Sequence, residues 1–396
     1  MATLLETNRP SEADPVDILF LIPTLQGGGA ERSLVVLISG LVRLGVKTTL
    51  AVFHLRNAVF LSRLPPECRV IDLNSDRARQ SILAIIRTVW RLRPEVLFVT
   101  LSHLNLLVGL IRRLLPRETI CVAQQVTMIS DSTVMHTGLG AKVRRRLYEF
   151  SYSRFDQIIC VSQAVLEDLR TTLRLDEKVL RVIHNPIDLE ELRSEIASTV
   201  PSEADEFFGS LPQGSTRLVA AGSLNHTKGF DILIDALALC DDDSLQAVVL
   251  GEGILRNELE CRAHASNLSD RVHFVGFKPD PFRWFAKADW FVLSSRMEGF
   301  GNVVVEALAC GIPVIATPAG GAVAEILANI PECVVARKVD ATSLAHAIKE
   351  ATRSVRRTVA LSVADQFASA NISLKYLDAV DCLKAGKRSA RKLARS

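Results

Sequence analysis

The chain has 396 residues, which is more than one ordinary hydrophobic core supports, so we expect two domains. Apolar residues make up 48% and charged residues 23%, a composition that excludes an intrinsically disordered chain. The formal net charge of +3 is too small to indicate a nucleic-acid-binding protein.

Charge is unevenly distributed along the chain. Residues 1–190 hold 24 basic and 19 acidic side chains, residues 191–375 hold 17 and 23, and residues 376–396 hold 6 and 2. A basic first half and a basic tail favour contact with an anionic partner such as a membrane surface. An ordinary solvated surface accounts for counts of this size equally well.

The cysteine pattern and the N-terminal sequence indicate in which cellular compartment the protein is found. The eight cysteines include no C-x-x-C pair and no metal-ligand spacing with histidine, so we expect buried thiols in a reducing compartment. The N-terminus has no basic segment followed by an apolar run, and no uncharged apolar stretch is long enough to span a bilayer. We therefore expect a cytoplasmic protein, either soluble or peripheral at the inner face of the plasma membrane.

The first half alternates between short apolar runs and amphipathic helical patterns. After a polar tail, VDILFLIP predicts a first strand, and apolar side chains from Leu34 to Leu44 at helical spacing predict a helix that ends at Gly45. Further strands are predicted at KTTLAVFHL, EVLFVTL, TICVA, DQIICVS and LRVIHN. This alternation favours right-handed β-α-β units and a parallel sheet.

The first strand and the first helix are joined by the loop GGGAE, which starts at Gly27. Glycine lets the backbone approach a ligand closely, and amides at a helix N-terminus attract anions. We therefore expect Gly28 and Gly29 to face a phosphate or a sugar hydroxyl. A purely structural turn is the alternative; a dinucleotide site is disfavoured because the loop is not G-x-G-x-x-G.

The alternation breaks over residues 190–215, where acidic residues are in excess, and a second alternating series begins at RLVAAG. We place the interdomain connection there. The expected organisation is two Rossmann-like, doubly wound parallel-sheet domains that face a central cleft, with ligands at the carboxyl ends of the strands. The expected segments are a disordered tail (1–15), an N-terminal domain (16–195), a C-terminal domain (196–370), and a C-terminal helix with a basic tail (371–396).

Two loops of the second domain carry candidate chemistry. Lys228 lies beside Gly229 between a predicted strand and helix, where a compact positive charge can meet a diphosphate. The segment EGFGNVVVE, from Glu298 to Glu306, follows the predicted strand DWFVLSS. Both carboxylates can face one ligand and accept hydrogen bonds from vicinal hydroxyls of a ribose or hexose. A solvated lysine and capping acids are the alternatives for each residue taken alone.

Together these segments resemble glycosyltransferase family 4, the retaining group 1 glycosyltransferases of GT-B architecture. The glycine-rich first loop followed by Ala-Glu, the lysine-glycine loop and the two spaced glutamates carry the resemblance. HNPID at His184–Asp188, VVLGEG and VHFVGF are also similar to family segments. The resemblance extends from about residue 17 to about residue 350, and it is more specific in the second domain.

The resemblance implies roles for these residues. Glu306 would hold the donor ribose, Glu298 would hold hydroxyls of the transferred sugar, and Lys228 would neutralise the leaving diphosphate. Glycosyl transfer passes through an oxocarbenium-like state, so the charge that develops on the leaving group is what the protein must stabilise. The donor would also be bound by the segment after Glu298 and by the loops of both domains, that is by Phe300, Gly301, Asn302, Val303, Ser223, Gly28 and Gly29.

Ser223 departs from the family pattern, which often has arginine after the first glycine of the lysine loop. A second phosphate contact is then lost or supplied by another residue, such as His226. No D-x-D loop indicates a metal, so we expect neither a metal nor a cofactor. His103, after the predicted strand EVLFVT, lies where related enzymes present a residue to donor sugar or acceptor; it is a candidate catalytic residue, with a packed or capping histidine as the alternative.

Two basic regions are candidates for contact with an anionic lipid carrier or membrane. One comprises Arg112, Arg113 and Arg144 to Arg146, and the other is the tail from Lys384 to Arg395. A solvated helical surface is the alternative for the arginines.

The resemblance implies transfer of a hexose or N-acetylhexosamine from a nucleotide diphosphate sugar, which we expect to be a UDP-sugar. The acceptor would be a glycan or a lipid-linked molecule in polysaccharide or cell-envelope assembly. One alternative is a non-catalytic nucleotide-sugar-binding partner in a transferase complex, which Ser223 favours. A second is an NAD-dependent Rossmann enzyme, which leaves the spaced glutamates and the lysine loop unexplained.

Overall fold

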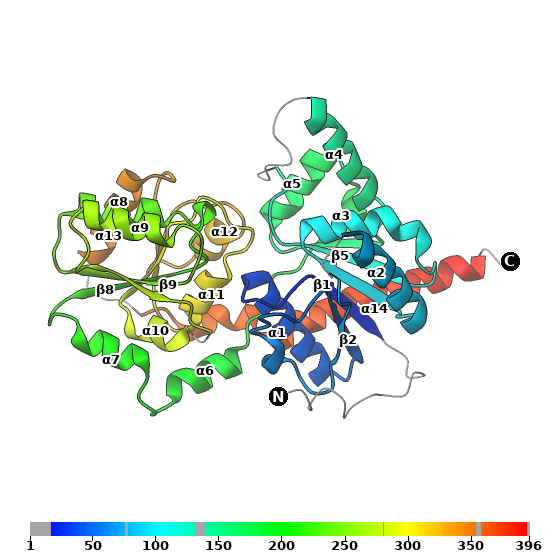
Figure 1. Cartoon of the computed structure of the whole chain (residues 1–396), viewed down its shortest axis with the longest axis horizontal. Helices are drawn as coiled ribbons and strands as arrows, with labels where there is room; N and C mark the ends of the chain where they lie inside the picture. Colours follow the sequence, from blue (N-terminus) through cyan, green and yellow to red (C-terminus); the bar gives the residue numbers. More distant parts are fainter. Residues whose placement is uncertain (1–16, 76–77, 131–138, 280, 354–357, 394–396) are drawn as a thin grey trace.

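The computed structural model describes residues 17–75, 78–130, 139–279, 281–353 and 358–393. Two α/β lobes lie side by side and each is built around one parallel sheet (Figure 1). The first sheet has the order β3-β2-β1-β4-β5-β6-β7, and the second has the order β10-β9-β8-β11-β12-β13. The expected parallel sheets are therefore present in both halves of the chain.

The strands of the first sheet are short, and most of their side chains are buried because helices cover both faces of the sheet. Their bounds are β1 Ile18–Ile22, β2 Thr48–Val52, β3 Arg69–Asp72, β4 Val96–Thr100, β5 Ile120–Gln125, β6 Gln157–Cys160 and β7 Leu180–Val182. The helices of this lobe are α1 Gly29–Arg43, α2 Ala78–Leu92, α3 Ser102–Ile111, α4 Leu139–Tyr152 and α5 Gln163–Leu173.

The second lobe repeats this construction. Its strands are β8 Thr216–Ala221, β9 Leu245–Leu250, β10 Val272–Gly276, β11 Trp290–Leu293, β12 Val314–Ala316 and β13 Val334–Val335. Its helices are α8 Phe230–Cys240, α9 Arg256–Ala265, α10 Phe282–Lys287, α11 Asn302–Ala309, α12 Val323–Leu327 and α13 Ala341–Thr352.

The order of strands reverses beside β1 in the first sheet and beside β8 in the second. At such a switch point the loops leave neighbouring strands in opposite directions and open a crevice at the carboxyl ends. The loops after β1, β8 and β11 leave from these crevices and face the other lobe. The topology therefore brings together the three loops that the sequence singled out.

The segment around residues 190–215, where the interdomain connection was expected, contains most of one helix and all of a second. Helices α6 (Leu189–Ala197) and α7 (Glu203–Ser210) both pack against α10 of the second lobe. The side chain of Ser202 caps α7 by accepting a hydrogen bond from the amide of Asp205. The boundary expected at 195–196 therefore falls inside α6. The tail expected over residues 1–15 lies outside the described residues.

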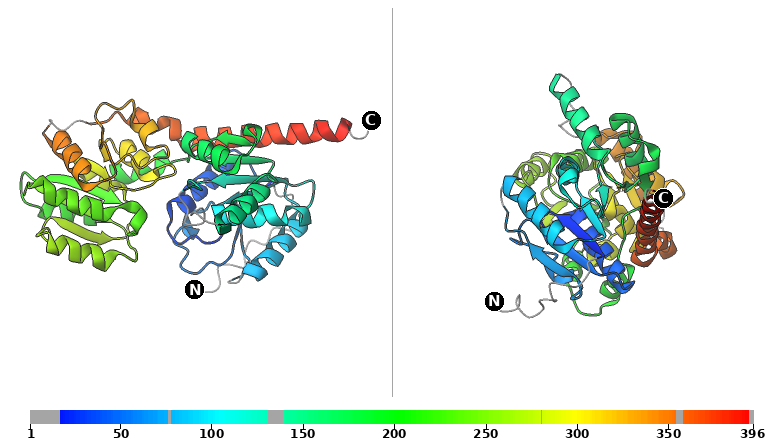
Figure 2. Two further views of the ribbon diagram at one scale, coloured as in Figure 1. Left: turned by 90° about the horizontal axis from the view of Figure 1, so that it is seen from above. Right: turned by 90° about the vertical axis from the view of Figure 1, so that its right-hand side faces the viewer.

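The C-terminal helix α14 (Ser369–Leu393) crosses back to the first lobe, as Figure 2 shows. The crossing is fixed beside Ile187, which hydrogen-bonds through its backbone to Phe367 and Ser369. Ile372 and Tyr376 of α14 are buried in the core of the first lobe. The sequence predicted a terminal helix but not this packing. No helix within the described ranges has the length and apolar character needed to cross a membrane.

Candidate active site

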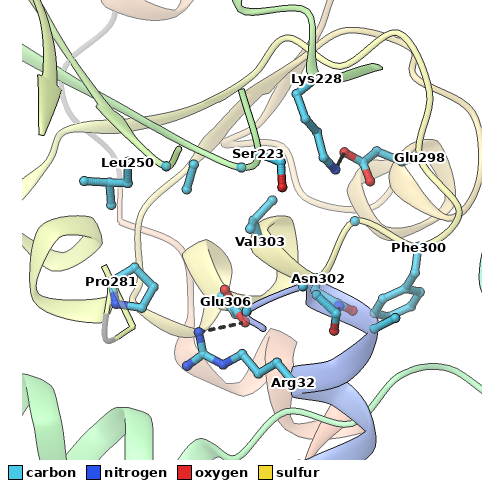
Figure 3. Close-up of a pocket in the computed structure, with 18 of the residues that line it drawn as sticks. Arg32, Ser223, Lys228, Leu250, Pro281, Glu298, Phe300, Asn302, Val303 and Glu306 are labelled. Atoms are coloured by element: carbon cyan, nitrogen blue, oxygen red, sulfur yellow. Dashed lines mark hydrogen bonds and ion pairs between the residues drawn. The ribbon is translucent and has the colours of Figure 1, made fainter. Parts of the chain in front are cut away.

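A cavity of about 440 Å³ lies between the two lobes and is lined by loops from both (Figure 3). The structure brings every predicted donor-binding residue to its wall, namely Gly28, Gly29, Ser223, Lys228, Glu298, Phe300, Gly301, Asn302, Val303 and Glu306. His103 and His226 are not among the lining residues. The individual roles given to the lining residues stay predictions.

Lys228 and Glu298 form an ion pair at one end of the cavity. The Nζ atom of Lys228 lies 2.6 Å from Oε1 of Glu298, and Ser295 Oγ donates to the same oxygen at 2.7 Å. The Glu298 side chain is 9% exposed and that of Lys228 is 25% exposed, so the pair is partly withdrawn from water. A ligand that contacts Lys228 therefore competes with Glu298 for the ammonium group.

The backbone beside Lys228 requires glycine. Gly229 has a φ of +62°, and a Cβ added there would lie 2.1 Å from the carbonyl oxygen of Ser294. Ser294 in turn donates from Oγ to the carbonyl of Lys228. The lysine loop is thus packed directly on the loop that follows β11, which fixes Lys228 relative to Glu298.

Glu306 lies at the other end of the cavity and faces Arg32 of the first lobe. The Nη1 atom of Arg32 is 3.7 Å from Oε1 of Glu306, and the side chains are 15% and 7% exposed. The guanidinium also lies over the ring of Phe282, 4.7 Å from its centroid. Sequence reasoning missed Arg32, although its position directly after the loop GGGAE, in the first turn of a helix, was a usable signal.

Two backbone amides of the glycine-rich loop donate hydrogen bonds to Glu31, which follows the glycines. The Glu31 carboxylate accepts hydrogen bonds from the amides of Gly27 and Gly28 at 2.8 and 3.0 Å, and from the hydroxyl of Thr24 at 2.6 Å. The amide of Gly28 thus donates to Glu31 in this structure, while Gly28 itself lines the cavity, and its expected contact with a phosphate or a sugar hydroxyl stays a prediction. Gly29 begins α1 and accepts a hydrogen bond at its carbonyl from Asn302.

The lobes touch closely around this cavity. A Cβ on Gly299 would lie 1.8 Å from the carbonyl oxygen of Val126, so only glycine permits this approach. Ser162 Oγ donates to the carbonyl of Gly299 at 2.9 Å. The ring of His184, in the segment HNPID, lies 5.5 Å from the ring of Phe300, and burial lowers the pKa of this histidine. The structure therefore shows the two lobes closed on one another.

His103 lies in the first turn of α3 and is exposed, outside the wall of the cavity. Its neighbour Ser102 accepts a hydrogen bond from Gln125, which also donates to the carbonyl of the lining residue Thr127. The structure thus sets His103 beside the site rather than in it. The backbone carbonyl of His226 accepts a hydrogen bond from Arg296, and His226 does not line the cavity. The expectation that it supplies a contact in place of an arginine at Ser223 stays a prediction.

No group of three or more histidine, cysteine, aspartate or glutamate side chains in the described part of the chain is arranged to hold a metal ion. The expectation that no metal is required stays a prediction. Among the residues that the structure describes, the cationic side chains that line the cavity are Arg32, Lys228 and Lys278, and Lys278 is paired with Glu203 at 2.6 Å.

Comparisons with known proteins extend these observations. Residues 202–359 match the family described as glycosyl transferases group 1, and residues 27–191 match glycosyltransferase family 4. The chain is 28% identical over 314 residues to N-acetylgalactosamine-N,N'-diacetylbacillosaminyl-diphospho-undecaprenol 4-alpha-N-acetylgalactosaminyltransferase of Campylobacter jejuni, covering 75% of this chain and 79% of that protein. It is 30% identical over 240 residues to the lipopolysaccharide core biosynthesis mannosyltransferase LpsB of Rhizobium meliloti, covering 59% of this chain and 62% of that one.

Solved structures share the fold. Anabaena HepE in complex with UDP-glucose superposes with a TM-score of 0.77 at 21% identity, covering 92% of this chain and 99% of that one. WaaG, a glycosyltransferase involved in lipopolysaccharide biosynthesis, gives 0.67 at 17% identity, covering 91% and 95%. The predicted fold class, two Rossmann-like domains in the GT-B arrangement, is confirmed.

Proposed function

The chain belongs to the group 1 glycosyltransferases, and we propose that it moves a hexose or N-acetylhexosamine from UDP to a glycan or lipid-linked acceptor, with retention of anomeric configuration. One observation carries the proposal: the cavity holds Lys228 with Glu298 at one end and Glu306 at the other. Family membership leaves the NAD-dependent alternative without support.

The choice of UDP rests on shared architecture. HepE has been crystallised with UDP and with UDP-glucose, and it shares its fold with this chain over 92% of the residues. The Campylobacter relative is a transferase of N-acetylgalactosamine to a diphospho-undecaprenol-linked sugar, which supports a lipid-linked acceptor and a role in cell-envelope glycan assembly. The relative LpsB, a mannosyltransferase of lipopolysaccharide core biosynthesis, also supports a role in cell-envelope glycan assembly.

In the proposed reaction the bond from the anomeric carbon to the diphosphate oxygen breaks as the oxygen of the acceptor hydroxyl bonds to the anomeric carbon, and the hydroxyl proton passes to the departing diphosphate oxygen. The diphosphate gains negative charge, and Lys228 stabilises it together with the N-terminus of α11, where no side chain caps the helix. When the donor binds, before this bond breaks, Glu298 exchanges the ammonium of Lys228 for hydroxyls of the sugar. Glu306 accepts from the ribose diol. The closed lobes exclude water, which would otherwise hydrolyse the donor.

Arg32 supplies the positive charge that Ser223 lacks. Ser223 lines the cavity with a neutral hydroxyl at the place where the family often has arginine. Arg32 enters from the facing lobe and its guanidinium is fixed by Glu306 and by Phe282. A guanidinium held in this way is prepared to bind phosphate or to orient the carboxylate that holds the ribose. Neither role requires a metal, so we expect activity to persist in EDTA.

We propose that α4 brings the acceptor from an anionic membrane. Val143, Leu147 and Phe150 recur at helical spacing on α4 and are 65%, 41% and 50% exposed. Lys142 and the three arginines 144–146 flank them. An exposed apolar stripe with basic flanks is typical of helices that lie in a membrane interface. Arg112 does not join this surface, because it bonds to the carbonyls of Pro116 and Thr119. Lys384 and Lys387 of the tail are paired with Glu95 and Asp156.

A panel of nucleotide sugars tests the proposal. Thermal stabilisation of the full chain identifies the donor, and slow release of UDP with transfer to a lipid-linked diphosphate sugar establishes the activity. Stabilisation without release of UDP would favour the non-catalytic alternative. Flotation with liposomes tests the role of α4: binding is expected with anionic lipid and is expected to fall when Leu147 is replaced by glutamate. Flotation that ignores lipid charge would contradict the membrane proposal.

A further inference from the structure

A network of buried side-chain hydrogen bonds runs from the C-terminal helix to the cavity. The Nε2 atom of Gln124, at the end of β5, donates to the hydroxyl of Tyr376 on α14 at 2.8 Å and to Oδ1 of Asn185 at 3.3 Å. Asn185 Nδ2 donates to Oδ1 of Asn302 at 2.9 Å. The side chains of Gln124, Asn185 and Tyr376 are all buried. We call these three residues together with Asn302 the interdomain network.

Asn302 is where this network crosses between the lobes. It is the first residue of α11 in the second lobe, and its side chain bonds to residues of the first lobe. Besides accepting from Asn185, its Nδ2 atom donates to the carbonyl of Gly29 at 3.0 Å and to Oγ of Ser33 at 2.9 Å. These contacts join the N-terminal turn of α1 to the N-terminal turn of α11. Both turns line the cavity.

The network fixes the orientation of each amide in it. Gln124 accepts from Thr100 at Oε1 and uses both hydrogens of Nε2 on Asn185 and Tyr376. Asn302 likewise uses both hydrogens of Nδ2 on Gly29 and Ser33. A rotated amide at Gln124 or Asn185 would place like groups together in a buried site, where an unmade hydrogen bond carries the full desolvation penalty. Asn302 is half-buried, and a rotated amide there would set its nitrogen against Nδ2 of Asn185 and its oxygen against the carbonyl of Gly29. The orientation of the carboxamide of Asn302 therefore depends on residues as distant as Tyr376.

We propose that Asn302 holds the two lobes closed over the cavity, and that Tyr376, Gln124 and Asn185 act as positioning residues for it. The C-terminal helix thereby sets the fraction of molecules in the closed form. The apparent affinity for a ligand is proportional to the closed fraction, so it decreases when fewer molecules are closed. Tyr376 therefore influences binding although it does not line the cavity. The inference rests on the proposed function only in naming a UDP-sugar as the ligand that the closed cavity holds.

Two native cysteines allow closure to be measured without ligand. Cys261 on α9 of the second lobe and Cys382 on α14 are both exposed. Cys68, Cys121, Cys160 and Cys240 are buried, and burial raises the pKa of Cys310 and Cys333, so these thiols react slowly with a spin label. The distance distribution between labels at Cys261 and Cys382, from double electron–electron resonance, then reports the separation of the lobes.

Three variants test the proposal. Asn302→Asp keeps the shape of the side chain but removes both donors, and it is expected to add a second distance population in the unliganded protein. Tyr376→Phe removes only the hydroxyl and is expected to have the same effect to a smaller extent. Ser369→Ala is the control, because Ser369 Oγ bonds α14 to the carbonyl of Val36 outside the network. This variant is expected to keep the wild-type distribution.

Affinity for UDP separates positioning from simple stability. We expect the Kd to rise about 10-fold in Asn302→Asp and about 3-fold in Tyr376→Phe, and to change less than twofold in Ser369→Ala. The double variant Asn302→Asp/Tyr376→Phe is expected to match Asn302→Asp alone, because the two residues act through one contact. A wild-type distance distribution in Asn302→Asp would overturn the role of Asn302. Additive effects in the double variant would overturn the positioning role of Tyr376. If UDP does not bind at all, the proposed function fails while the distances still decide the role of Asn302.

Discussion

Lys228 and Glu298 contact each other at 2.6 Å across the wall of the interdomain cavity, although each was expected to hold a different part of a donor. The ammonium group therefore already has a carboxylate as its counter-charge within the cavity wall. Glu298 is itself held by Ser295, which donates to the same oxygen. In the proposed complex, donor binding replaces this ion pair by an ion pair between Lys228 and the diphosphate and by hydrogen bonds from the sugar hydroxyls to Glu298.

Replacing Lys228 by alanine tests the first of these contacts. We expect turnover to fall at least ~100-fold, the scale for losing one main stabiliser of transition-state charge. Lys278→Ala is the matched control, because Lys278 lines the same cavity but is paired with Glu203. It is expected to retain most of the activity in a steady-state assay of UDP release. Near-normal turnover in Lys228→Ala would refute the assignment of Lys228.

Replacing Glu298 by glutamine tests the second contact and separates binding from chemistry. The variant keeps the size of the side chain but frees Lys228 from its counter-charge. We expect UDP to bind at least as tightly as to the wild type, because an anion no longer competes for the lysine. We expect transfer to fall about 100-fold, since the grip on the sugar is weakened. Calorimetric titration with UDP and an assay of transfer measure the two effects. If UDP binding and sugar transfer both fell to the same extent, Glu298 would instead stabilise the conformation of its loop.

Arg32→Met tests the residue that was not predicted. It removes the cation beside Glu306, whose side chain is only 7% exposed, and leaves a largely buried carboxylate without its partner. We expect the KM for the UDP-sugar to rise about 10-fold with a smaller change in kcat. Arg43→Met, on the same helix but in an exposed ion pair with Asp188, is expected to change KM less than twofold. Equal effects of the two substitutions would contradict a specific role for Arg32.

Gly229→Ala tests the packing that holds the lysine loop. Its φ of +62° costs about 1–2 kcal/mol for alanine, and the added Cβ would collide with the carbonyl of Ser294 at 2.1 Å. We therefore expect the melting temperature to fall by clearly more than in Gly214→Ala, where φ is +85° but nothing lies within 4 Å of the added Cβ. Scanning calorimetry measures both. Equal losses would show that the contact with Ser294 relaxes without cost.

Much of the fold was predictable because buried parallel strands appear in the sequence as short apolar runs. The run around β1, ILFLI, is buried at every position, and the helix after it ends where Gly45 adopts a positive φ. Residues 190–215 were predicted less well. Helices α6 and α7 are short and acidic, and their apolar positions are defined by packing on α10, which local periodicity does not reveal.

Site residues were predictable where a local sequence motif marks them. Contacts formed between the two lobes were not predictable. Lys228 and Glu298 lie in strand-to-helix segments that contain glycine, and Glu306 lies in α11, the helix that follows the second of these segments. Arg32 faces Glu306 only because α1 and α11 meet across the interface, a relationship of residues more than 270 positions apart. The donor of Gly28 is used by Glu31, three residues along the same turn. His103 was assigned by analogy of position, and the path of α3 leaves its side chain outside the cavity wall.

The central claim is that the cavity between the lobes binds a UDP-sugar between Lys228 and the two glutamates. A crystal structure of the chain with a non-hydrolysed UDP-sugar tests it most directly. The account predicts the diphosphate within hydrogen-bond distance of Lys228 Nζ, the ribose hydroxyls on Glu306 and the sugar hydroxyls on Glu298. A donor bound elsewhere, with the ion pair between Lys228 and Glu298 unbroken, would contradict it.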